Sequence, residues 1–151
     1  KAAGVTVLED AKVTITAEGE QLVLLGVNDP SFETDYLLGD SETVMRTKLA
    51  ELHTVDSFTV LLSHRPELFP IYAENKVDLV LSGHAHGGQF RLPLIGGLFA
   101  PGQGILPRLT SGWYFDRRLL VSRGLTNSAG APRINDPCEL ILLHLKGEND
   151  P

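Results

Sequence analysis

Cysteine, methionine and tryptophan each occur only once in this chain of 151 residues, and aromatic residues make up 7% of it. The single cysteine, Cys138, excludes an internal disulfide, and we expect it to be a small buried residue. The sequence also contains no apolar run near the roughly 20 residues that a membrane-spanning helix needs. These shortages exclude a disulfide-stapled scaffold and argue against a membrane span in this sequence.

Basic residues are scarce as well. The chain has 13 lysines and arginines against 19 aspartates and glutamates, which gives a formal net charge of -6. This balance does not favour binding to nucleic acid or to anionic membranes in general. It remains compatible with phosphate substrates, because bound divalent cations reverse the sign of the local field. With 42% hydrophobic residues, the chain can bury a core, and residues 1–151 are predicted to form a single domain.

Three histidines stand at the ends of two apolar runs. His84 and His86 lie in the string Gly83-His84-Ala85-His86-Gly87-Gly88-Gln89, which follows the apolar run 77–82, and His64 follows the run 58–63. Two such runs joined by a short helical crossover are expected to be parallel neighbours, so their carboxyl ends share one edge of a sheet. Neutral imidazole is the commonest metal ligand in proteins. The pattern therefore favours a metal site over three structural loop histidines.

The remaining pattern is β-rich. An amphipathic helix is predicted over 41–53, with Asp40 or Ser41 as its N-cap, and a crossover helix over 66–75 with Pro70 in its first turn. Strands are predicted over residues 5–8, 12–16, 21–27, 56–63, 77–82, 112–115, 118–122 and 139–145.

A long connection rich in glycine, proline and aliphatic residues covers residues 90–111. Loops of this length usually have a function or are disordered, and the apolar content argues against simple disorder. Two interpretations stay open. The loop either packs over the sheet or forms a lid beside the metals that contacts a hydrophobic part of the substrate or a membrane face.

The histidine strings resemble those of a known family. Leu62-Ser63-His64-Arg65-Pro66 and the run from Leu79 to Gln89 are similar to the last two metal motifs of the calcineurin-like metallophosphoesterases, in the bacterial branch whose final motif reads G-H-x-H-G-G-Q. The segment 26–30 is similar to the G-V-x-D-P segment of that branch, and 121–125, 132–133 and 138–140 are similar to its closing strands. The resemblance implies an α/β fold: the β-rich half of an α/β/β/α sandwich, with a mixed sheet and two or three helices.

The same resemblance implies metal-dependent phosphoester hydrolysis. His64 and His84 would ligate one divalent ion and His86 a second, with Mn, Fe or Zn suited to the mixed donor set of the family. The family motifs D-x-H, G-D-x-x-D and G-N-H-[D/E], which supply the catalytic histidine and the bridging carboxylate, are absent here. We therefore expect a C-terminal part of a larger enzyme that binds metal weakly or not at all and is inactive alone. No catalytic residue is assigned, and substrate-binding residues are unknown. Arg123 and Arg133 could clamp a substrate phosphate through bidentate hydrogen bonds, but we interpret them as surface ion-pair partners.

The expected partners follow from this interpretation. They are a phosphoester substrate, and either the N-terminal half of the same enzyme or a second copy of the chain against an exposed sheet face; nucleic acid is not expected. The location is expected to be cytoplasmic or peripheral to a membrane, with any anchor in preceding sequence. Two other classes stay open: a non-catalytic metal-binding or regulatory module, and a β-rich interaction module in which the three histidines are structural.

Overall fold

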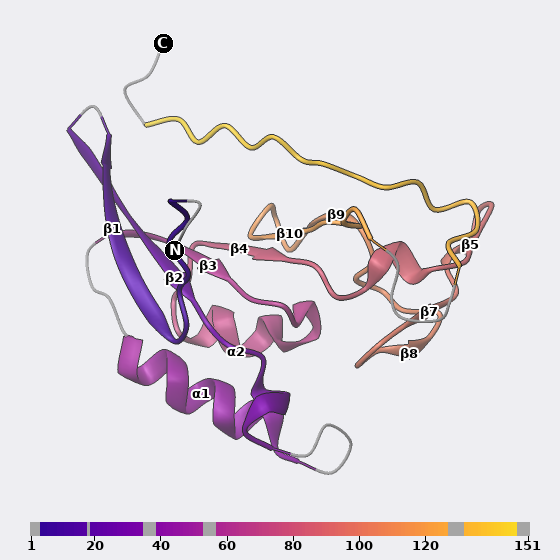
Figure 1. The fold of residues 1–151 in the computed structure, drawn as a ribbon, viewed down its shortest axis with the longest axis horizontal. Coiled ribbons are helices and arrows are strands. Elements are labelled where there is room, and N and C mark those ends of the chain that lie inside the picture. The colour runs from indigo at the N-terminus through magenta and orange to yellow at the C-terminus, as the bar shows by residue number, and fades with distance from the viewer. Residues whose placement is uncertain (1–3, 18, 35–38, 53–56, 127–131, 148–151) are drawn as a thin grey trace.

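The computed structural model describes residues 4–17, 19–34, 39–52, 57–126 and 132–147 of the chain. Within these residues, six strands form one mixed sheet in the order β1-β2-β3-β4-β10-β9 (Figure 1). Their bounds are Ala11–Ala17 (β1), Glu20–Gly26 (β2), Phe58–Leu62 (β3), Leu79–Ser82 (β4), Gly112–Tyr114 (β9) and Leu119–Val121 (β10). The mixed α/β fold class predicted from the sequence is therefore confirmed.

Four neighbouring strands of this sheet, β2, β3, β4 and β10, run parallel, and β1 and β9 flank them in the antiparallel sense. In β3 and β4, consecutive residues on both faces are buried, among them Val60 and Leu61, and Leu79 and Val80. This is why the two runs are apolar without alternation. Leu62 of β3 lies opposite Leu81 of β4, so both strands end at the same edge, as predicted.

Two helices, α1 (Ser41–Leu52) and α2 (Phe69–Glu74), cover one face of the sheet (Figure 1). Asp40 caps α1, because its carboxylate accepts a hydrogen bond of 2.9 Å from the backbone N–H of Thr43. Pro70 lies in the first turn of α2, as predicted. Short 3-10 turns, η1 (Pro30–Phe32) and η2 (Pro66–Leu68), follow β2 and precede α2. Neither helix in the described part of the chain is long or apolar enough to cross a membrane.

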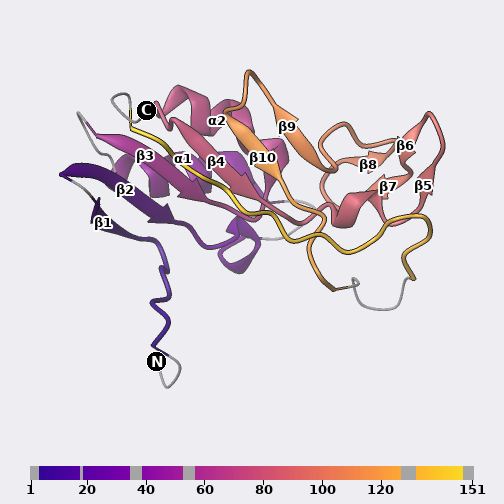
Figure 2. The ribbon, with the colours of Figure 1, turned by 90° about the horizontal axis from the view of Figure 1, so that it is seen from above.

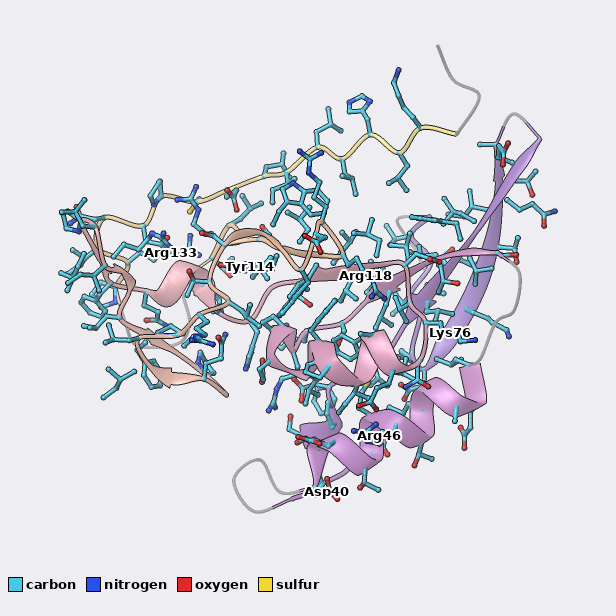
Figure 3. The ribbon with its side chains drawn as sticks, turned by 180° about the vertical axis from the view of Figure 1, so that it is seen from behind. Asp40, Arg46, Lys76, Tyr114, Arg118 and Arg133 are labelled. Carbon is cyan, nitrogen blue, oxygen red and sulfur yellow. The ribbon has the colours of Figure 1, made fainter. Side chains whose placement is uncertain are left out.

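The hydrophobic core lies between these helices and the sheet. Met45 of α1 and Tyr72 of α2 are completely buried there, and Leu61 meets them from the sheet. Outside this core, Arg46 of α1 reaches toward α2 and pairs with Glu74, which ties the two helices together (Figure 3). The predicted helix over 41–53 is thus confirmed as far as Leu52, while residue 53 lies outside the described residues.

Between β4 and β10 the chain leaves the sheet and forms a turn and two small hairpins at one end of the molecule (Figure 2). The turn η3 is His86–Gly88; the first hairpin pairs β5 (Arg91–Leu92) with β6 (Gly96–Gly97), and the second pairs β7 (Phe99–Ala100) with β8 (Gly104–Ile105). The predicted long loop over 90–111 is therefore built of hairpins that the sequence pattern did not indicate, because two-residue strands carry no readable alternation.

Three local predictions were wrong. Residues 5–8 and 139–145 are not strands: in the described chain they pair with none of the sheet strands, although 139–145 runs extended along the helix-free face (Figure 1). Alternating apolar residues show that a segment can place one side against a sheet. The alternation does not show whether another strand is available to form hydrogen bonds with the segment. Cys138 is exposed rather than buried, and its thiol lies 3.2 Å from the carbonyl oxygen of Leu125.

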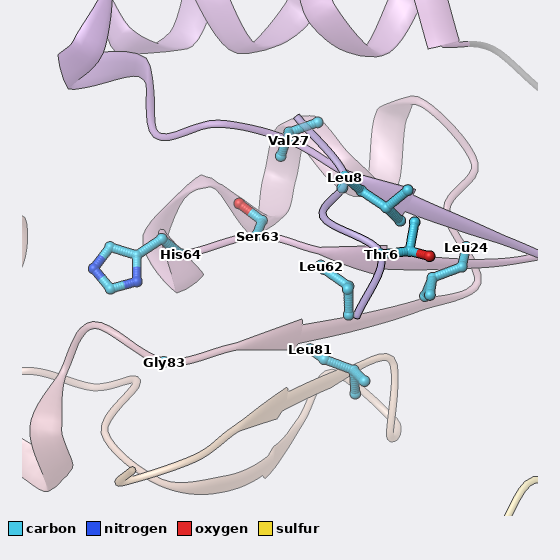
Figure 4. A pocket seen from close by; sticks show the side chains of 10 residues that line it. Thr6, Leu8, Leu24, Val27, Leu62, Ser63, His64, Leu81 and Gly83 are labelled. Carbon is cyan, nitrogen blue, oxygen red and sulfur yellow. The ribbon is translucent and has the colours of Figure 1, made fainter. Parts of the chain in front are cut away.

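The sheet face without helices is markedly apolar. Phe58 and Ile15 on this face are 47% and 42% exposed. Thr6 and Leu8 of the N-terminal segment cover part of the face and, with Leu62 and Leu81, line a groove that leads to His64 (Figure 4). Exposed or partly exposed apolar side chains on this face include Val13, Ile15, Leu22, Leu24, Phe58, Leu62, Leu81 and Trp113.

Candidate metal centre

The carboxyl ends of β3 and β4 bring two of the three predicted ligands together. His64 stands two residues after β3, and His84 stands two residues after β4. Nδ1 of His84 lies 2.8 Å from Nε2 of His64, and the two rings meet edge to face with centroids 4.4 Å apart. The predicted convergence of these two histidines is therefore present, at the edge where open α/β sheets hold their ligands.

A run of left-handed backbone conformations shapes the histidine turn. His84 has a φ of 66°, His86 a φ of 44° and Gly87 a φ of 63°. For residues with a Cβ, this region is sparsely populated and costs energy. The chain can therefore reverse direction immediately after β4, which directs His84 toward His64. Strained backbone of this kind concentrates at binding and catalytic sites.

Both paired imidazoles are poor bases in this setting. Burial, together with the neighbouring His64 and Arg65, lowers the pKa of His84 to about 4. Burial also lowers the pKa of His64, although the nearby Asp29 opposes this shift. The two rings are therefore neutral at neutral pH, and a metal ion binds imidazole only in its neutral form.

His86 is oriented by a backbone carbonyl. Its Nδ1 lies 3.2 Å from the carbonyl oxygen of Thr126. A carbonyl oxygen only accepts hydrogen bonds, so Nδ1 must carry the proton, and in the neutral ring the lone pair is then on Nε2. Metal-ligating histidines commonly donate their second ring nitrogen in this way. His86 is thus prepared to ligate, but no group of three or more histidine, cysteine, aspartate or glutamate side chains suited to one ion occurs within the described ranges.

A buried ion-pair chain lies beneath His64. Arg65 is 6% exposed; its guanidinium lies 3.5 Å from the carboxylate of Asp29 and 2.5 Å from that of Glu67. Burial raises the pKa of Asp29, but hydrogen bonds from Ser31 and the charge of Arg65 outweigh this and hold it below its usual value. Asp29 belongs to the segment 26–30 that contributed to the family resemblance, yet sequence reasoning gave it no role. Its position three residues after the parallel strand β2 was the signal that could have identified it.

A second carboxylate supports the histidine turn from below. The Asp136 side chain is completely buried, 3.6 Å from Nε of the buried Arg133. It lies so close to Gly87 that a Cβ at that position would collide with it. Arg123 pairs with Glu139 at 3.0 Å, so both arginines are ion-pair partners as predicted; Arg133, however, is buried rather than at the surface. Sequence reasoning did not find Asp136, because it is nearly fifty residues from the turn it supports.

The site therefore consists of neutral imidazoles at the carboxyl edge of a parallel sheet, with buried ion pairs behind them. This is the layout of an α/β protein with a candidate ligand site at the carboxyl edge of its sheet. No family model matches the chain, and no solved structure matches it. Curated proteins do match, and they identify the class more closely.

Several curated relatives are named for phosphoester hydrolysis. The phosphodiesterase YaeI of Escherichia coli (strain K12) is 29% identical over 147 residues, which cover 96% of this chain and 49% of that protein. An uncharacterized metallophosphoesterase of Aquifex aeolicus (strain VF5) is 31% identical over 134 residues, which cover 85% and 47%. The uncharacterized metallophosphoesterase YkuE of Bacillus subtilis (strain 168) is 34% identical over 94 residues, which cover 61% and 32%.

These similarities confirm the resemblance to the calcineurin-like metallophosphoesterases that the histidine strings indicated. The chain spans about half the length of the Escherichia coli and Aquifex relatives that it matches.

Proposed function

We infer that this chain is the C-terminal portion of a metal-dependent phosphoester hydrolase, in which His64 and His84 ligate one divalent ion and His86 a second. The observation that carries this inference is the 2.8 Å contact between ring nitrogens of His64 and His84 at the strand ends. Two nitrogens that meet at this separation need only a small outward shift to share one ion. The names of the relatives support the reaction class.

The residues present fit a divalent metal in part. Three imidazoles supply borderline nitrogen donors, which suit Mn, Fe or Zn. When bound, such ions polarise a phosphoryl oxygen and lower the pKa of a water molecule. The chain contributes the imidazoles, lowers the pKa of His64 and His84 through burial, and fixes the tautomer of His86 through Thr126. Because a bridging carboxylate is absent from the described group, this chain alone is expected to bind metal weakly and to hydrolyse little or no substrate.

The helix-free sheet face provides the place for the remainder of such an enzyme. It carries exposed apolar side chains across β1, β2 and β3, and its groove ends at His64 (Figure 4). A partner on this face would therefore border the histidines directly. The proposed partner is the N-terminal half of the same enzyme, and a second copy of the chain is the alternative occupant when that half is missing.

The test compares His84→Ala with His144→Ala in a polypeptide that includes the sequence preceding this chain. His144 is exposed on the extended C-terminal segment, so it is a matched histidine control. With Mn²⁺ present, hydrolysis of bis-p-nitrophenyl phosphate should fall at least about a hundredfold for His84→Ala and stay unchanged for His144→Ala. Equal activity of the His84→Ala variant and the unsubstituted protein would contradict the assignment. Metal binding without hydrolysis by the longer polypeptide would instead favour a non-catalytic metal-binding module.

A further inference from the structure

The two hairpins that follow the histidine turn carry a cluster of exposed aliphatic side chains. Leu94, between β5 and β6, is fully exposed, and Ile105 of β8 is 77% exposed. Both hairpins lie together at the end of the molecule opposite β1 (Figure 2). We call this cluster the hairpin patch; its most exposed members are Leu92, Leu94, Ile95, Phe99, Ile105 and Leu106.

The hairpin patch has a fixed shape. Phe99 and Ile105 are directly paired across β7 and β8, and Gln103 holds the second hairpin by exchanging hydrogen bonds of 2.9 Å with the backbone of Leu109. Gly97 of β6 packs so tightly on Gly88 of η3 that a Cβ on either residue would collide with the other. The exposure is therefore built into the fold, and the patch is anchored to the turn that contains His86.

The charge around the patch differs from that of the rest of the chain. The protein has 19 acidic residues, yet none occurs between Asp78 and Asp116. The charged residues in this interval are Arg91 and Arg108. Arg91 is directed inward, with a hydrogen bond of 2.7 Å to the carbonyl oxygen of Gly87, whereas Arg108 is exposed. The acidic side chain of Glu67 lies against Gly102 in the β7–β8 turn, but it is largely buried and paired with Arg65. An apolar tip next to an exposed cation complements an anionic lipid surface.

We propose that the hairpin patch inserts into the headgroup and upper acyl region of an anionic lipid surface, with Arg108 at the level of the lipid phosphates. Lipid fits better than a protein partner because the two most prominent side chains, Leu94 and Ile95, lie in the short turn between β5 and β6. Stable protein interfaces need a broad complementary face of about 800 Å² on each partner. Aliphatic side chains on hairpin tips instead enter a fluid interface one at a time.

Insertion would place the histidine turn at the membrane surface, since Gly88 and Gly97 connect the turn to the patch. Phosphoesters of amphiphilic molecules would then lie within reach of the site. This consequence for the substrate rests on the proposed hydrolase function. Lipid binding by the hairpin patch does not depend on that function, so an experiment can contradict either proposal without contradicting the other.

The test is sedimentation of the chain with vesicles, with no metal or substrate present. One set of vesicles contains equal parts of phosphatidylcholine and phosphatidylglycerol, and the other contains phosphatidylcholine alone. The double variant Leu94→Glu, Ile95→Glu should bind the anionic vesicles at least about tenfold more weakly than the unsubstituted chain. Arg108→Gln should weaken binding to the anionic vesicles alone. Phe32→Glu is the control, because Phe32 is 81% exposed but lies in η1, away from the hairpins.

Two results would overturn the proposal. One is that the unsubstituted chain binds neither kind of vesicle; the other is that the double variant binds as tightly as the unsubstituted chain. Light scattering tests the alternative that a second copy of the chain binds to the hairpin patch. A dimer that becomes monomeric in the double variant, with no vesicle binding, would assign the patch to a contact between copies of the chain and would also overturn the lipid assignment.

Discussion

At the scale of single residues, Gly83 and Gly87 occupy the same histidine turn but stand in different surroundings. Gly87 has a φ of 63° and a buried carboxylate, Asp136, where a Cβ would project, whereas the Cβ position at Gly83 is open. Gly87→Ala should therefore destabilise the protein by about 2 kcal/mol, because an alanine there must adopt the left-handed region and displace a buried charge.

Urea denaturation monitored by circular dichroism gives this free energy of unfolding. Gly83→Ala is the matched control and should lie within about 0.5 kcal/mol of the unsubstituted protein. If both substitutions cost the same, the contact between Gly87 and Asp136 is not what supports the turn.

A buried lysine gives a prediction about pH. Lys48 of α1 is 6% exposed; its ammonium lies 2.6 Å from the carboxylate of Asp10 and also pairs with Glu33. Burial opposes ionisation of Asp10, but hydrogen bonds from Lys48 and Asn28 outweigh it and lower its pKa below 3.8. A lowered carboxyl pKa contributes stability above the unfolded value, and that contribution is lost as pH falls through the folded value.

Asp10→Asn should therefore be less stable than the unsubstituted protein by about 1 kcal/mol at pH 7, and the difference should disappear as the pH falls through the lowered folded pKa of Asp10. Urea denaturation at a series of pH values measures it. A difference that stays constant down to the acid limit would show that the Asp10 charge is not responsible.

At the scale of elements, the extended segment 139–145 differs most clearly from the strands. Within the described ranges it is outside every sheet, whereas β3 and β4 are bonded on both sides. Amide hydrogen exchange should therefore be rapid for residues 140–145 and slow for Val60, Leu61 and Val80. Mass spectrometry of the exchanged protein resolves these segments. Equal protection of both would mean that the segment is paired in solution.

The same contrast shows how far the sequence could predict the fold. The apolar runs of β3 and β4 and the cap at Asp40 are local signals, and their predictions were confirmed. The strands predicted over 5–8 and 139–145 were wrong. Alternating apolar residues indicate a preference for extended backbone, but they do not show that a partner strand lies beside the segment. The hairpins β5 to β8 were missed because glycine and proline hide such short strands in what reads as loop.

The candidate site also has one part that the sequence could predict and one part that it could not. Contact between His64 and His84 follows from the ends of two parallel strands, so it was predictable from the order of apolar runs. The carbonyl of Thr126 beside His86 and the carboxylate of Asp136 beneath Gly87 depend on contacts between segments 40 or more residues apart. Without the coordinates, no local pattern identifies such partners.

At the scale of the whole molecule, one face of the sheet has helices and the other has exposed apolar side chains. The chain is therefore expected to self-associate when no other polypeptide covers that face. Multi-angle light scattering should give a mass above 16.4 kDa for the unsubstituted chain. The double variant Ile15→Glu, Phe58→Glu, which places charge on this face, should shift the mass to that of the monomer.

Phe32→Glu serves as the control on the helix side and should leave the association unchanged. A stable monomer of the unsubstituted chain at all concentrations would remove the argument for a partner on this face.

The return of the chain to the sheet has a consequence for how such proteins diverge. β10 lies directly beside β4, although β5 to β9 intervene in the sequence. The part of the chain between Ser82 and Gly112 begins and ends at one edge of the sheet, because both residues are in register with Val121 of β10. Its outer part can be lengthened, shortened or exchanged during evolution while the sheet and the histidine edge persist. The outer hairpins can therefore change in sequence and length independently of the strands that position His64 and His84.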